Sequence, residues 1–159
     1  DIDYSLINYV MKKENLTLEE VDNKLNKTSG LEGIAGMNDL RDIDAGFING
    51  DEKVVLAMEM YTNRIVEYVS KYFVKLEGKV DAMVFTAGLG ENQPDHRSAI
   101  CKALSCFGVE IDEERNNAAI KGKCDEISTP NSKIKVYVIP TNEELVIARD
   151  TMEIVESMK

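Results

Sequence analysis

Several residue types are scarce in this chain of 159 residues, and each shortage argues against a class of protein. The chain has no tryptophan, one histidine (His96) and three cysteines. Since Cys101, Cys106 and Cys124 have neither an even count nor metal-ligand spacing, we expect a reducing compartment, the cytoplasm. A lone histidine with no obvious partner gives little support to a nucleophilic triad. We expect His96 on the surface, and Cys101 and Cys106 in the core.

Positive charge and long apolar runs are also scarce. Lys and Arg total 19 against 29 Asp and Glu, a formal net charge of −10. Nucleic-acid binding relies on clustered Lys and Arg, so we expect no nucleic-acid partner. No apolar run approaches the roughly 20 residues that span a bilayer, and no signal-like N-terminus is present, so we expect no membrane partner. The chain opens without methionine and enters a helical pattern almost at once, which we interpret as a cut within a longer protein.

The residue pattern that is present predicts an α/β fold with a mixed sheet. Thr17 and Glu20 form a capping box, the sequence signature of a helix start. Apolar residues at helical spacing predict a long helix over residues 51–76, and Pro94 and Gly108 bound a second helix. β-branched and large apolar runs predict buried strands at 80–85 and 134–139. A final helix is expected to extend from the Thr141-Asn142 cap to Met158. Strand–turn–helix units alternating in this way are typical of α/β proteins.

The most informative segment follows the first of these strands. Residues 86–92 read Thr-Ala-Gly-Leu-Gly-Glu-Asn, and a helix is predicted to begin at Pro94. A glycine turn between strand and helix aims free N–H groups at an anion, and glycine lets a phosphate approach the main chain. We therefore interpret residues 86–92 as a phosphate-binding loop. The segment fits neither the P-loop pattern nor the dinucleotide fingerprint, and an ordinary strand-to-helix turn would satisfy the same spacing.

The second candidate segment is the junction after the other strand, Ile-Pro-Thr-Asn-Glu-Glu at residues 139–144. Glu143 and Glu144 fall in the first helical turn, where acids complement the helix dipole. Alternatively, a carboxylate at the end of a strand, across a crevice from a phosphate loop, holds Mg²⁺ with water and phosphate oxygens. The residues alone leave both interpretations open.

Three segments together resemble the C-terminal part of the acetate kinase family: residues 39–42, 85–92 and 139–148. The resemblance covers essentially the whole chain in the family's order and spacing. It implies a ribonuclease H-like fold of the actin-like ATPases, with residues 1–159 forming a single C-terminal lobe and the N-terminal lobe absent. It also implies phosphoryl transfer between ATP and acetate, giving acetyl phosphate and ADP, with Mg²⁺.

The resemblance assigns roles to particular positions. Glu143 matches the magnesium-site glutamate of the family, whereas Glu144 does not carry that role. The other matched positions bind nucleotide, at the adenosine end or beside the phosphates: Asp39, Leu40 and Arg41 for the former, and Gly88, Leu89, Gly90, Glu91 and Asn92 for the latter. The loop before Asp39 is one residue shorter than is usual in the family.

No catalytic residue is assigned to this chain. In the family, the acyl pocket, an arginine pair, a histidine and an acid belong to the other lobe and the segment just before Asp1. We therefore expect acetate or acetyl phosphate to bind through that lobe, and these 159 residues alone to be inactive. The alternatives are a propionate or butyrate kinase lobe, and a dimerisation module without catalysis. A homodimer is expected in either kinase case.

Overall fold

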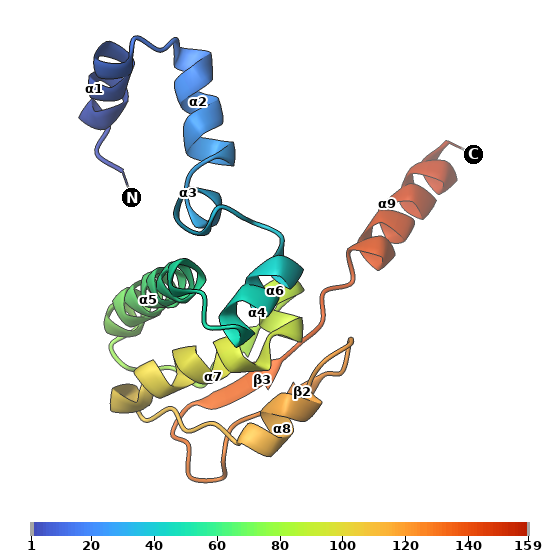
Figure 1. Ribbon diagram of the computed structural model, residues 1–159. Coiled ribbons are helices and arrows are strands. Elements are labelled where there is room, and N and C mark those ends of the chain that lie inside the picture. The colour runs from blue at the N-terminus through green and yellow to red at the C-terminus, as the bar shows by residue number, and fades with distance from the viewer. Residues whose placement is uncertain (1, 159) are drawn as a thin grey trace. The chain divides into compact units, whose positions relative to one another are not determined.

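The computed structural model describes residues 2–158 and divides into two compact units, Asp1–Arg64 and Ile65–Lys159 (Figure 1). The helix α5 contributes to both. The first unit is helical, with α1 (Ser5–Glu14), α2 (Leu18–Lys27), α3 (Leu31–Ala35), α4 (Leu40–Ile48) and the first part of α5 (Glu52–Lys75). The second unit holds the rest of α5 and then β1 (Ala82–Phe85), α6 (Ala87–Asn92), α7 (Pro94–Ala103), the 3-10 helix η1 (Ser105–Phe107), α8 (Glu113–Ala118), β2 (Asp125–Glu126), β3 (Lys135–Val138) and α9 (Glu143–Ser157).

The first unit confirms the capping box. The side chain of Thr17 accepts a hydrogen bond from the backbone N–H of Glu20, whose carboxylate accepts one from the N–H of Thr17. A small core forms between α3, α4 and α5, around Ala35, Ile43, Val54 and Ala57. Gly46 is required here, since a Cβ at this position would lie 2.8 Å from a methyl carbon of Val54.

The second unit is built on a sheet of strand order β1-β3-β2. β1 and β3 are parallel, with Ala82 opposite Lys135 and Phe85 opposite Val138, and β2 is antiparallel to β3. The strand predicted at 134–139 is confirmed and its inward side chains are buried. The strand predicted at 80–85 is present, but it is not buried: Val84 is 48% exposed, because β1 is the edge strand of the described sheet.

The core of this unit lies between the sheet, α7 and the second half of α5. Ile100 of α7 and Leu104, the C-cap of that helix, are buried in one cluster with Val136 and Val138 of β3. Phe73 of α5 stacks on Phe107 of η1, with ring centroids 4.3 Å apart.

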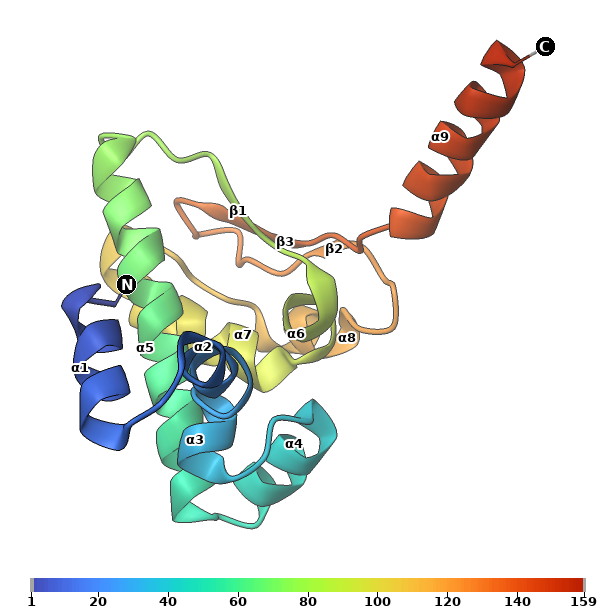
Figure 2. The ribbon, with the colours of Figure 1, turned by 90° about the horizontal axis from the view of Figure 1, so that it is seen from above.

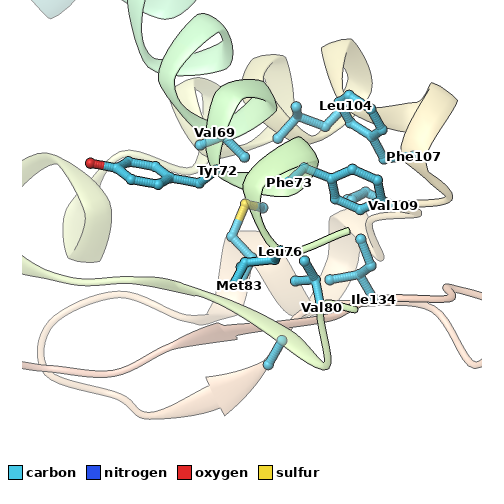
Figure 3. A pocket seen from close by; sticks show the side chains of 11 residues that line it. Val69, Tyr72, Phe73, Leu76, Val80, Met83, Leu104, Phe107, Val109 and Ile134 are labelled. Atoms are coloured by element: carbon cyan, nitrogen blue, oxygen red, sulfur yellow. The ribbon is translucent and has the colours of Figure 1, made fainter. Parts of the chain in front are cut away.

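An apolar cavity of about 180 Å³ opens beside the stacked pair (Figure 3). Carbon-rich side chains such as Val69, Met83 and Ile134 line it, and the hydroxyl of Tyr72 points away from it. Nucleotide phosphates need charged or N–H donors, so this cavity is a gap in the core rather than the candidate site.

Two expectations about single side chains are wrong, and one is confirmed. His96 is only 7% exposed, since the start of α7 packs towards α8 rather than towards solvent. Cys106 is exposed in η1, whereas Cys101 is buried as expected. Burial raises the pKa of the Cys101 thiol to about 12 and lowers the pKa of the His96 imidazole.

The last helix begins as predicted but buries none of its side chains. Large apolar residues of α9 are exposed, among them Ile147, Met152 and Ile154, and Figure 1 shows α9 leaving the end of β3. The apolar side chains of α9 therefore pack against no core of the described residues. No described helix combines the length and apolarity that a membrane crossing requires.

Candidate functional site

The parallel pairing of β1 and β3 brings the two candidate segments to the same edge of the sheet. The ladder continues past the strands, where the N–H of Ile139 donates to the carbonyl of Phe85 at 3.0 Å. The 88–92 segment follows β1 directly, and the junction to α9 follows β3, at the same end of the sheet (Figure 2). Ligands of open α/β sheets bind outside the carboxyl ends of the strands, and both segments lie there.

The segment expected to be a glycine loop is the short helix α6. The left-handed residue of α6 is Ala87, at φ 61°, and neither Gly88 nor Gly90 has a positive φ. Gly90 is required by close packing instead, because a Cβ there would lie 3.3 Å from the carbonyl carbon of Phe85. Gly88 has no neighbour within 4 Å of its missing Cβ. A ligand can therefore approach the main chain at Gly88 without meeting a side chain.

Glu91 ties α6 to the other candidate segment. One oxygen of its carboxylate accepts hydrogen bonds from the N–H of Ala87 at 2.8 Å, the N–H of Thr141 at 2.8 Å and the hydroxyl of Thr141 at 3.0 Å. The bond from the Thr141 backbone is the main cause of the lowered pKa of Glu91. This carboxylate is engaged by protein donors, which favour its charged form, and the three bonds order this edge of the sheet.

Asn92 is held from two sides. Its amide nitrogen donates to the carbonyl of Gly88 at 3.2 Å, and its amide oxygen accepts from the N–H of Lys121 at 3.3 Å. Leu89, between the glycines, is half-buried. The 88–92 segment is thus fixed by its own side chains and by the turn that follows α8.

Glu143 is the first residue of α9 and is exposed, as is Glu144. Asn142 is the N-cap, and its side chain accepts from the N–H of Leu145 at 3.0 Å. The carboxylate of Glu143 makes no hydrogen bond or ion pair to the residues that the structure describes. The helix cap therefore does not depend on Glu143, which separates the two interpretations of this residue experimentally.

A magnesium ion fits the donor chemistry at this edge. Within residues 2–158 no group of three or more Asp, Glu, His or Cys side chains gathers in a way that could hold a metal. Mg²⁺ keeps several waters and is commonly held by one or two carboxylates together with substrate phosphates. Glu143 supplies one exposed carboxylate at the junction that follows β3, which fits that requirement.

The third segment belongs to the first unit. Asp39 is the N-cap of α4 and accepts a hydrogen bond from the N–H of Arg41 at 2.9 Å. Two further bonds from the guanidinium, at 3.0 and 2.7 Å, lower the pKa of Asp39 to about 2. Leu40 is half-buried against the small core, and the side chain of Arg41 is exposed. This geometry orients the Arg41 guanidinium on the surface at the start of α4.

Sequence reasoning missed two residues that hold the site. Arg97 and Asn116 are fully buried and join α6, α7 and α8. A charged residue in the first two turns of a helix reads as solvent-facing, so only the oddity of an arginine between two other buried positions could have singled it out.

Comparison with known proteins identifies the family. The model of the acetokinase family matches residues 1–149. The chain belongs to the acetokinase family. It is 49% identical over 158 residues to acetate kinase from Halothermothrix orenii, covering 99% of this chain and 39% of that relative. The chain therefore spans about two-fifths of the length of the relatives it matches.

Solved acetokinase structures share the fold. Acetate kinase from Porphyromonas gingivalis matches with a TM-score of 0.86 and 40% identity, over 98% of this chain and 39% of that one. A propionate kinase from Francisella tularensis matches with a TM-score of 0.83 and 37% identity, over 93% of this chain and 37% of that one. These matches confirm the α/β fold of the actin-like ATPases that the resemblance implied.

Proposed function

We propose that this chain is the nucleotide- and magnesium-binding lobe of an acetate kinase, which transfers a phosphoryl group between ATP and acetate. Family membership supports the reaction class. The observation that carries the proposal is the link from Glu91 to Thr141, which joins the 88–92 segment to the junction holding Glu143. Phosphoryl transfer requires phosphate and metal to be held next to each other, and a tie between the two segments supports such an arrangement.

In this proposal, the nucleotide is bound near its phosphates by backbone groups of the 88–92 segment rather than by charged side chains. The opening at Gly88 admits a phosphate, and Leu89, Gly90 and Asn92 complete the surface on which it lies. Glu91 acts from within, since its carboxylate already accepts three hydrogen bonds from protein groups. Asp39, Leu40 and Arg41 contact the adenosine end, with Arg41 oriented by the Asp39 carboxylate.

Glu143 is the proposed magnesium residue. Glu143 would hold Mg²⁺, and the ion would supply neutralisation of phosphate charge. The side chain of Glu143 supplies one negative oxygen donor from the first turn of α9. The cap at Asn142 keeps that turn in place whether or not the carboxylate is engaged.

We further propose that the 159 residues bind ADP weakly and do not turn over alone. Catalysis of phosphoryl transfer requires the acceptor to be positioned and the charge on the transferring group to be neutralised. The acyl site and the cationic groups are proposed to come from the rest of the relatives' length. The test is calorimetric ADP titration of the chain, together with an assay for acetyl phosphate. Binding without turnover is expected. Turnover by the pure chain contradicts the proposal that the acyl site and the cationic groups come from elsewhere. Absence of ADP binding contradicts the proposed function.

Propionate kinase remains a second candidate, because the Francisella tularensis enzyme of that name matches at 37% identity. The two activities differ in the acyl group, whose site lies outside the proposed role of this chain. Comparing kcat/KM for acetate and propionate in a protein that carries this chain with the remaining family length separates them. If kcat/KM is clearly higher for propionate than for acetate, propionate is the substrate.

Assembly and location form the last part of the proposal. A homodimer is supported by the exposed apolar residues of α9, and sedimentation of the chain at several concentrations tests it. A third candidate is a dimerisation module without catalysis, which predicts dimers that do not bind ADP.

Free cysteines at 101, 106 and 124 support a reducing compartment, the cytoplasm.

A further inference from the structure

Arg97 is the largest fully buried side chain in the described chain, with an exposed fraction of 0%. Burying a guanidinium is costly unless its donors are satisfied. All four oxygens that accept hydrogen bonds from it are neutral. They are the Asn116 side chain at 2.8 Å and the carbonyls of Gly90, Asn116 and Ala119 at 2.9, 2.7 and 2.9 Å. The guanidinium is thus held in the interior by neutral acceptors alone, each at a defined position of the fold.

The four bonds connect the candidate nucleotide segment to the end of α8. One bond holds the carbonyl of Gly90, in the middle of α6, and two hold carbonyls at the last turn of α8. Asn116 continues the connection by donating to the carbonyl of Pro94 at 2.9 Å. Two residues beyond Ala119, the N–H of Lys121 donates to the side chain of Asn92. Arg97 therefore fixes Gly90 directly and Asn92 through the turn after α8.

We infer that Arg97 is a positioning residue that sets the conformation of the 88–92 segment for nucleotide binding, without itself touching the nucleotide. This inference rests on the proposed function. A planar guanidinium presents its donors in a rigid fork, which is why one side chain can hold two separate segments, α6 and the end of α8. Lysine carries three donors on a flexible stem and cannot reproduce the four directions together.

The test compares Arg97→Lys with a matched control, Ser98→Ala, in the 159-residue chain. Ser98 is also buried in α7 and also reaches α8, since its hydroxyl donates to Glu113 at 2.6 Å, but no bond from it reaches α6. Two quantities are measured: hydrogen exchange of the amides in α6 without nucleotide, and the Kd for ADP. Protection of the amides in β3 reports whether each variant is folded.

With Arg97→Lys we expect α6 amides to exchange about tenfold faster and ADP to bind about tenfold more weakly, while β3 stays protected. Ser98→Ala should leave both quantities as in the parent chain. If Arg97→Lys retains parental α6 exchange and ADP affinity, the inference is wrong. It is equally wrong if Ser98→Ala produces the same two changes, because the role is then only structural.

A second variant covers the case in which Arg97→Lys fails to fold. Asn116→Ser removes the side-chain acceptor and the bond to Pro94 while keeping the three backbone acceptors of Arg97. A smaller change in the same direction is expected, and no change in α6 exchange overturns the inference. A parent chain that does not bind ADP instead refutes the proposed function. The exchange measurement then still decides whether Arg97 orders α6.

Discussion

Glu91 and Thr141 lie fifty residues apart in the chain, and their hydrogen bonds close the edge of the sheet at which α6 and α9 begin. Thr141 donates both its N–H and its hydroxyl to the same carboxylate oxygen. Neither residue needs to touch a ligand to matter. The bond pair joins the segment that holds Gly88 to the junction that leads into Glu143, the two features on which the proposed function depends.

The tie at Glu91 predicts a stability difference that depends on pH. The folded-state pKa of Glu91 is lowered, so the stabilisation from its carboxylate is complete above its ordinary value of 4.5 and is lost as the pH falls through the lowered value. Glu91→Gln should therefore be less stable than the parent chain at pH 7, with the gap narrowing below pH 4.5. Urea unfolding at a series of pH values measures it. If the difference in unfolding free energy between the two proteins does not change with pH, the Glu91 carboxylate does not stabilise the fold through these hydrogen bonds.

The substitution Gly88→Ala should affect ADP binding without lowering the stability of the fold. Its Cβ enters open space at a residue with ordinary helical φ, so stability should be unchanged or rise by about 0.4–1 kcal/mol. The same methyl group obstructs close approach of a phosphate, and ADP affinity should fall about tenfold. Thermal unfolding and ADP titration measure the two effects. Parental affinity in a stable Gly88→Ala protein would place the nucleotide elsewhere.

The single histidine gives the chain a pH response of its own. Burial lowers the pKa of His96, so the unfolded chain binds a proton at higher pH than the folded chain does. Stability should consequently fall as the pH drops below about 6.5, with a slope of at most about 1.4 kcal/mol per pH unit. Histidine is the side chain whose ordinary pKa lies between pH 5 and 8, and His96 is the only histidine in the sequence, so His96→Gln should flatten the dependence there. An equally steep dependence in His96→Gln would show that another group titrates.

Thiol accessibility tests the packing of α7. Burial raises the pKa of Cys101 to about 12, whereas Cys106 and Cys124 are exposed. A thiolate-specific reagent at pH 8 should modify two thiols quickly in the native chain, and the third only at the rate of unfolding. Cys101→Ala serves as the control and should lose only the slow phase. Three equally fast thiols would mean that the core around α7 is open.

Local rules predicted much of the fold. The capping box at Thr17 and Glu20, the helix start at Pro94 and the left-handed Gly108 each depend on a few neighbouring residues, and the structure confirms all three. The strand at 134–139 was equally clear because its β-branched residues alternate inward. Two-residue β2 carries no such pattern and could not be found.

The sequence predicts the two candidate segments of the site but not the hydrogen bonds that connect them to each other and to the rest of the unit. Gly88 to Asn92 and Glu143 were singled out, and parallel pairing puts both segments at one edge. The left-handed residue is Ala87 rather than a glycine, and Gly90 instead lies close to the backbone of Phe85, a contact between positions that no local pattern predicts. Arg97 was invisible in the sequence, because all its acceptors except one are backbone carbonyls, which carry no residue signature.

The most direct test is the magnesium dependence of ADP binding in the parent chain, Glu143→Gln and Glu144→Gln. The two glutamates are neighbours in the first turn of α9, are both exposed, and leave the Asn142 cap untouched. Glu143→Gln should abolish the strengthening of ADP binding by Mg²⁺ while keeping metal-free binding, and Glu144→Gln should resemble the parent. If magnesium strengthens binding equally in all three proteins, Glu143 does not hold the metal and the account of this edge is wrong.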